Sequence, residues 1–133
     1  MALPSFPRRE ERLPFFVSAA SDFRFFVDRR SISVGKDGVV RYTLIALSPK
    51  GAENISFEGM RCKSREHKTY ATGRADGSWS RREGPWRQVT QRWQLALRVE
   101  YFCPRGVPIA TAVEGIDALT SGGHPNKAPV SYD

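Results

Sequence analysis

The sequence has few of the residues on which catalytic and metal sites are usually built. It holds two cysteines and two histidines among 133 residues. Neither cysteine lies in a CxxC pair, which argues against a zinc site. The sequence also lacks a GxSxG nucleophile elbow and a glycine-rich phosphate-binding motif. We therefore expect no metal, no cofactor and no enzymatic activity.

Long apolar runs are absent as well. No stretch approaches the roughly 18 apolar residues of a membrane-spanning helix, so we expect no transmembrane segment. The N-terminus, MALPSFPRREER, lacks the apolar region of a signal peptide. The chain is therefore either cytosolic or the mature form of an exported protein.

The two histidines offer little to catalysis. His124 lies in a polar C-terminal stretch, where we expect it to be solvated. His67 follows Glu66 in a predicted strand, and neighbours in a strand point to opposite faces. We therefore expect His67 to be exposed and not paired with Glu66.

Positive charge, in contrast, is plentiful and unevenly distributed. The net charge is +7, and residues 61–92 alone hold nine basic and three acidic groups. Sixteen of the 21 basic residues are arginine, which forms bidentate contacts with carboxylate or phosphate. An anionic partner is physically reasonable, although an arginine-rich solvated surface has the same composition.

Arginine and tryptophan alternate within the basic segment. Glycine and proline predict a loop over residues 73–87, GRADGSWSRREGPWR. Aromatic rings stack on bases or sugars while guanidinium groups pair with phosphate or carboxylate. The candidate binding residues for nucleic acid or an acidic glycan are Arg74, Trp79, Arg81, Arg82, Trp86 and Arg87. The alternative, which we favour, is that the tryptophans anchor the loop on the sheet while the arginines stay solvated.

The apolar pattern predicts one globular domain over residues 14–120, between a flexible arm at 1–13 and a flexible tail at 121–133. Turn signals at 35–38 and 48–51 separate short apolar runs. The predicted strands cover residues 14–17, 23–27, 32–34, 39–47, 54–62 and 65–72. The strand at 39–47 is apolar on both faces, which is typical of a central strand covered on both sides.

The C-terminal part of the domain is predicted to be at least partly helical. Residues 92–103, RWQLALRVEYFC, alternate like a strand but also consist of good helix formers, so both remain open. Residues 108–119 have apolar side chains at helical spacing, with proline at the start. The predicted fold is α+β, with an antiparallel meander sheet and one or two C-terminal helices on one face.

The two cysteines, Cys62 and Cys103, lie 41 positions apart near the ends of predicted elements. From the residues alone they are either two buried thiols of a cytosolic protein or one disulfide of an exported protein.

Three segments resemble a known family, and they lie between residues 15 and 119. They are FFVSAASDFRFFVDRRSISVGKDGVVRYTL, NISFEGMRCKSREHKTYATGR and RVEYFCPRGVP. They are similar to the cryptic neisserial protein 1-like (CNP1-like) family of uncharacterised proteobacterial envelope proteins. The resemblance implies export after signal cleavage, a periplasmic or outer-membrane-associated location, and a disulfide between Cys62 and Cys103. It implies no catalytic residues. We therefore expect a non-enzymatic binding or structural module whose partner is an envelope protein or an anionic polymer.

Overall fold

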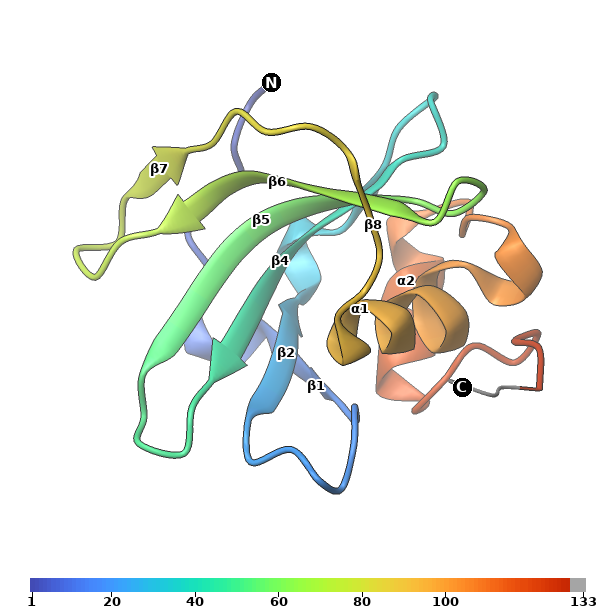
Figure 1. The fold of residues 1–133 in the computed structure, drawn as a ribbon, viewed down its shortest axis with the longest axis horizontal. Coiled ribbons are helices and arrows are strands. Elements are labelled where there is room, and N and C mark those ends of the chain that lie inside the picture. The colour runs from blue at the N-terminus through green and yellow to red at the C-terminus, as the bar shows by residue number, and fades with distance from the viewer. Residues whose placement is uncertain (130–133) are drawn as a thin grey trace.

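An antiparallel sheet forms the centre of the computed structural model, which describes residues 1–129 (Figure 1). Six strands follow one another across it in the order β1-β2-β4-β5-β6-β7, and two shorter strands extend it, β3 beside β4 and β8 beside β6. The strands are β1 (Arg12–Phe15), β2 (Arg24–Asp28), β3 (Ser33–Val34), β4 (Val40–Leu47), β5 (Glu53–Arg61), β6 (Glu66–Gly73), β7 (Trp79–Arg81) and β8 (Arg87–Gln88). The predicted antiparallel meander is confirmed.

Strand β4 occupies the middle of the sheet because both of its faces are apolar. It pairs with β2 on one side and with β5 on the other. Val40, Tyr42 and Leu44 point into the main core, while Thr43 and Ile45 are fully buried on the opposite face. A strand buried on both faces needs a covering layer on each side of the sheet.

Helices form the first covering layer, at one side of the sheet (Figure 1). The segment at 92–103 is helical. It begins as α1 (Arg92–Ala96) and widens into a π-helix, η3 (Leu97–Phe102). A capping box between Gln91 and Gln94 starts it. The ring of Phe102 packs 5.2 Å from that of Tyr42.

The last helix, α2 (Ala112–Thr120), is shorter than the predicted 108–119. The Thr111 side chain accepts a hydrogen bond from the backbone N–H of Glu114, at 3.2 Å, and this N-cap fixes the start of the helix. Pro108 therefore precedes the helix, following a short 3-10 turn, η4 (Pro104–Gly106). The predicted α+β class with C-terminal helices on the sheet is confirmed.

The beginning of the N-terminal arm lies against the second face of the sheet. Phe6 packs on Trp79 with ring centroids 5.1 Å apart. A Cβ atom at Gly73 would lie 2.9 Å from both Phe6 and Ile55, so glycine at this position lets the arm approach. The prediction of a loose arm separate from the domain therefore misses these contacts, and Arg12 and Leu13 belong to β1.

A disulfide joins the sheet to the helical layer. Cys62 directly follows β5 and Cys103 directly follows η3, and their Cα atoms lie 5.5 Å apart. Both residues are buried, with 2% and 1% of their surface exposed. The pairing implied by the family resemblance is confirmed.

The predicted tail, residues 121–133, begins by packing against the helical layer. The backbone N–H of His124 donates to the carbonyl oxygen of Glu100 at 2.7 Å, and Lys127 forms an ion pair with the Glu100 carboxylate at 3.1 Å. The end of the predicted tail, residues 130–133, lies outside the described residues. Among residues 1–129, no helix is long and apolar enough to cross a membrane.

Candidate functional site

The arginine- and tryptophan-rich segment is more ordered than the loop predicted for it. Its two short strands, β7 and β8, both pair antiparallel with β6. Residues 82–86 connect them and run alongside β6 (Figure 1). Sequence periodicity misses these strands because each has only two or three residues. The segment is therefore fixed to the outer part of the sheet at both ends.

Two hollows flank the connection, and together we name them the basic groove. Their volumes are about 490 and 510 Å³. Lys68, Arg81 and Arg82 line both, and Arg87 lines one of them. Lys68 lies in β6. Arg81 lies in β7, Arg87 in β8, and Arg82 in the connection between these two strands. The pairing of β7 and β8 with β6 brings these four cations together.

The cations of the basic groove are not neutralised by the protein. Within residues 1–129, none of the four lies within 4.0 Å of a carboxylate, and Glu83 is the one acidic residue that lines the groove. Arg82 donates to the hydroxyl of Thr72 at 3.3 Å, and Arg81 donates to the carbonyl oxygen of Met1 at 3.1 Å. These neutral acceptors orient the guanidinium groups and leave their charge available to an external anion.

The structure does not bring all the predicted binding residues together. Arg74 lies in the turn between β6 and β7, where its guanidinium is 3.5 Å from the Ser78 hydroxyl. Arg74, Trp79 and Trp86 do not line either hollow, whereas Arg81, Arg82 and Arg87 do. Lys68 belongs to the basic segment 61–92, but it is not among the predicted binding residues because the sequence places it in a polar strand and not in the loop.

Trp79 connects the N-terminal arm to the sheet. Its indole N–H donates to the carbonyl oxygen of Pro4 at 2.9 Å, and its ring packs between Phe6 and Phe57. A half-buried ring with its polar atom already bonded has little left for a ligand. These contacts favour the anchoring role for Trp79.

Trp86 is held by a stack of neighbouring side chains. The guanidinium of Arg61 lies 3.9 Å from the centre of the indole ring, and Tyr70 packs against it edge-on at 6.4 Å. One face of the ring is therefore already covered by a cation.

We expect Trp86→Ala to lower the free energy of unfolding by about 1–2 kcal/mol, because it removes one cation–π contact and one aromatic pair. Chemical denaturation measures this change, and Trp86→Phe serves as the control because it retains a ring. If the ring instead stacks on a ligand, heparin affinity drops while stability stays unchanged, and the anchoring role is wrong.

His67 lines one hollow of the basic groove but is half-buried, not exposed as predicted. Gln94 of α1 lies 3.0 Å from its Nε2 atom. Burial lowers the pKa of His67, and the positive charge of Arg87 lowers it further. Both effects favour the neutral imidazole, so His67 adds little to the positive charge of the groove.

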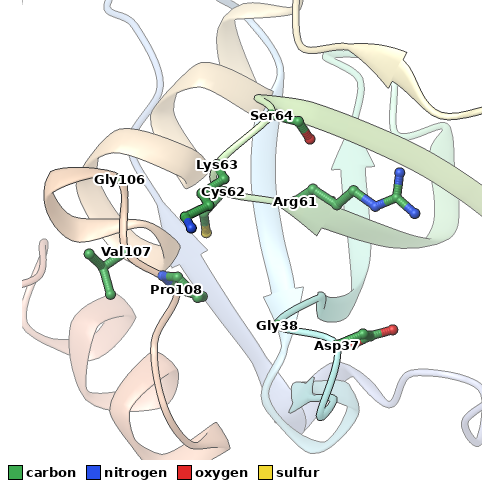
Figure 2. A pocket seen from close by; sticks show the side chains of 9 residues that line it. All are labelled: Asp37, Gly38, Arg61, Cys62, Lys63, Ser64, Gly106, Val107 and Pro108. Atoms are coloured by element: carbon green, nitrogen blue, oxygen red, sulfur yellow. The ribbon is translucent and has the colours of Figure 1, made fainter.

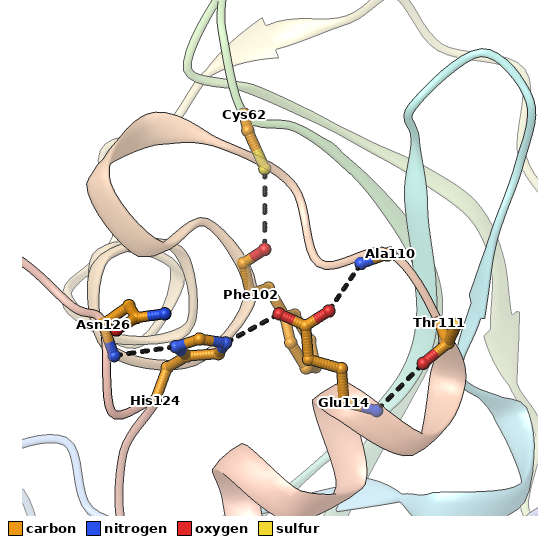
Figure 3. Close-up of polar contacts among 7 residues, drawn as sticks. All are labelled: Cys62, Phe102, Ala110, Thr111, Glu114, His124 and Asn126. Atoms are coloured by element: carbon orange, nitrogen blue, oxygen red, sulfur yellow. Dashed lines mark hydrogen bonds and ion pairs between the residues drawn. The ribbon is translucent and has the colours of Figure 1, made fainter.

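His124 and Glu114 form the one close histidine–carboxylate pair among the described residues (Figure 3). The prediction that His124 is solvated is wrong, because only 6% of it is exposed. Its Nε2 atom lies 2.7 Å from the Glu114 carboxylate, and its Nδ1 atom accepts from the backbone N–H of Asn126. With both nitrogens bonded, the imidazole has no free atom to act as a base, and the pair holds the tail against α2.

Among residues 1–129, no cluster of three histidine, cysteine, aspartate or glutamate side chains could hold a metal ion. The sequence model of the CNP1-like family matches residues 1–120. Comparison with curated proteins gives no match, and neither does comparison with solved structures.

Proposed function

This chain belongs to the CNP1-like family, and we propose that it is a non-enzymatic binding module of the cell envelope that holds an anionic polymer in the basic groove. The observation that carries this proposal is the set of four cations around one connection, none of them paired with a carboxylate within residues 1–129. Nucleic acid and acidic glycan both present the repeated negative charges that such a groove attracts.

Rigidity of the groove supports this function. Lys68 lies in β6, and β7 and β8 are tied to that strand by ladder pairing. A preformed array of cations binds a polyanion without first ordering its own backbone, which lowers the entropy cost of binding. Neutralised phosphates release condensed counterions, so the resulting affinity depends steeply on salt.

The envelope location has its own support. The buried Cys62–Cys103 disulfide is of a kind that persists in oxidising compartments such as the bacterial periplasm. The family resemblance implies the same compartment, either periplasmic or outer-membrane-associated. Cell fractionation of the protein expressed from its own gene tests this part, and recovery in the cytosol contradicts it.

We expect the double variant Arg81→Ala/Arg82→Ala to bind heparin more weakly than the unaltered protein. The slope of log affinity against log salt should flatten by about one unit for each arginine that no longer neutralises a sulfate, hence by about two. Heparin titrations at several salt concentrations measure both quantities, and single-stranded DNA in place of heparin distinguishes the two polymer classes.

The matched control is Arg29→Ala/Arg30→Ala, which removes the same charge from two adjacent exposed arginines outside the groove. Its heparin affinity and salt slope should stay close to those of the unaltered protein. Equal losses in the two double variants would show that overall charge, not the basic groove, determines binding, and the proposal would be wrong.

A further inference from the structure

A third hollow lies beside the disulfide, and we propose that it binds a small molecule with an apolar body and an anionic head group. Three turns meet there: the β3–β4 turn, the turn after β5, and the stretch that follows η4 (Figure 2). Its volume is about 330 Å³, at the lower end of the roughly 300–1,000 Å³ typical of ligand pockets.

The walls of this hollow are largely apolar. Val107 and Pro108 form one side (Figure 2), next to the Cys62 half of the disulfide. Gly38 and Gly106 have positive φ angles, of 78° and 81°, and add bare backbone to the lining of the hollow. Val107 is 62% exposed. An apolar ligand body would cover this side chain and remove it from water.

Two of the charged side chains around the hollow, Arg61 and Asp37, already have partners within the protein. The guanidinium of Arg61 is 3.5 Å from the Glu66 carboxylate and lies over Trp86, and it points away from Val107 in Figure 2. The Asp37 carboxylate accepts from Arg41 at 3.1 Å and from the backbone N–H of Val39 at 3.0 Å. Each of these two charges is therefore already satisfied by the protein.

Lys63 and Ser64 supply the remaining donors at the hollow. Within residues 1–129, the Lys63 ammonium has no hydrogen bond or ion pair, and the Ser64 hydroxyl has no hydrogen-bond partner. An unpaired ammonium beside an apolar wall selects a ligand that carries a negative charge on an apolar body. This gives the chemical class of the ligand.

The hollow is distinct from the basic groove. None of the four groove cations lines it. Its proposed ligand is small and amphipathic, whereas the groove is proposed to hold a polymer. The two proposals can therefore succeed or fail separately.

The test uses the folded 133-residue chain and 1-anilinonaphthalene-8-sulfonate, an aromatic sulfonate whose fluorescence rises in apolar surroundings. We expect saturable binding of one molecule per chain. N-phenyl-1-naphthylamine has a similar aromatic body without the sulfonate, and we expect it to bind more weakly. Near-UV circular dichroism confirms that each protein has native packing, because partly unfolded chains also bind the sulfonate probe.

Two variants locate the binding. Lys63→Glu replaces an attracting charge by a repelling one, and we expect about a tenfold or greater loss of affinity for the sulfonate probe but not for the uncharged probe. Val107→Asp should weaken the binding of both probes. Both positions are exposed, so these changes leave the core intact.

Matched controls exist for both changes. Lys50→Glu makes the same charge reversal in the β4–β5 turn, and Val113→Asp alters a valine on α2 that is 64% exposed. Both controls should bind like the unaltered protein. The proposal is overturned if binding does not saturate, if Lys63→Glu and Val107→Asp bind as tightly as the unaltered protein, or if the controls lose as much affinity.

Discussion

Replacing both cysteines by alanine is expected to lower the free energy of unfolding by about 4 kcal/mol, the value for opening a cross-link between residues 41 positions apart. Small domains are commonly stable by about 5–15 kcal/mol, so this loss is a large fraction of the total. The cause lies mainly in the unfolded chain, which gains conformational freedom once Cys62 and Cys103 are no longer joined. Urea denaturation of the double variant and of the unaltered protein measures the change.

Reductant provides the control for this prediction. Added reductant should destabilise the unaltered protein under partly denaturing conditions, whereas the alanine variant should not respond to it. Because both cysteines are buried, reduction should be slow in the absence of denaturant. An unchanged urea midpoint in the variant would show that the packing between the sheet and η3 holds the layers together without the cross-link.

The sheet could be predicted from the sequence because its central strands carry strong local signals. Strand β4 is apolar on both faces, and the turns at 35–38 and 48–51 contain the glycine that a positive φ angle requires. Gly38 and Gly51 have φ angles of 78° and 91°. Each of these signals lies within a few residues, so no distant contact is needed to interpret it.

The helical layer could be predicted only in part. Residues 92–103 alternate like a strand, yet packing of Leu97 and Phe102 against the sheet selects a helix. The π-helical turn shifts the register of these side chains, so an ordinary helical stripe does not describe them. Tertiary contacts therefore determine the conformation of residues 92–103, and the local sequence pattern does not reveal these contacts.

The basic groove depends on strand pairing that the local sequence pattern does not show. Composition singles out the segment 61–92, which holds Lys68 and the three arginines, but only the pairing of β6 with β7 and β8 shows that these four side chains line one groove. The packing of the N-terminal arm and of the start of the C-terminal tail depends on distant contacts in the same way. Trp79 and Glu114 supply their docking partners from elsewhere in the chain.

Glu58 is a buried carboxyl that the sequence pattern does not mark as unusual. It lies on the helical side of β5, 4% exposed, among the core side chains. The Ser56 hydroxyl donates to one carboxyl oxygen at 2.6 Å, and the Tyr42 hydroxyl lies 3.4 Å from the other. No cation lies within 4.0 Å of it among the described residues. Burial therefore outweighs these hydrogen bonds and raises the pKa of Glu58 to about 7.

We expect this pKa to make the folded protein less stable as the pH rises. Because the pKa of Glu58 is higher in the folded than in the unfolded chain, the folded state binds the proton more tightly. The resulting stabilisation is fully present below about pH 4.5, and it is lost as the pH rises through about 7. A shift of this size corresponds to about 3 kcal/mol.

The variant Glu58→Gln isolates this contribution, since a neutral amide has nearly the shape of the protonated carboxyl and still accepts from Ser56. The unaltered protein should lose stability between pH 4 and pH 8, whereas the variant lacks this loss. The difference in free energy of unfolding, variant minus unaltered protein, should therefore rise by about 3 kcal/mol over this range. Urea denaturation at a series of pH values measures this difference, and Glu10→Gln, at an exposed position, serves as the control. If the difference stays constant with pH, water or a structural rearrangement solvates the Glu58 carboxylate in the folded protein. The sheet would then be less tightly packed beneath its helices than the contact between Tyr42 and Phe102 indicates.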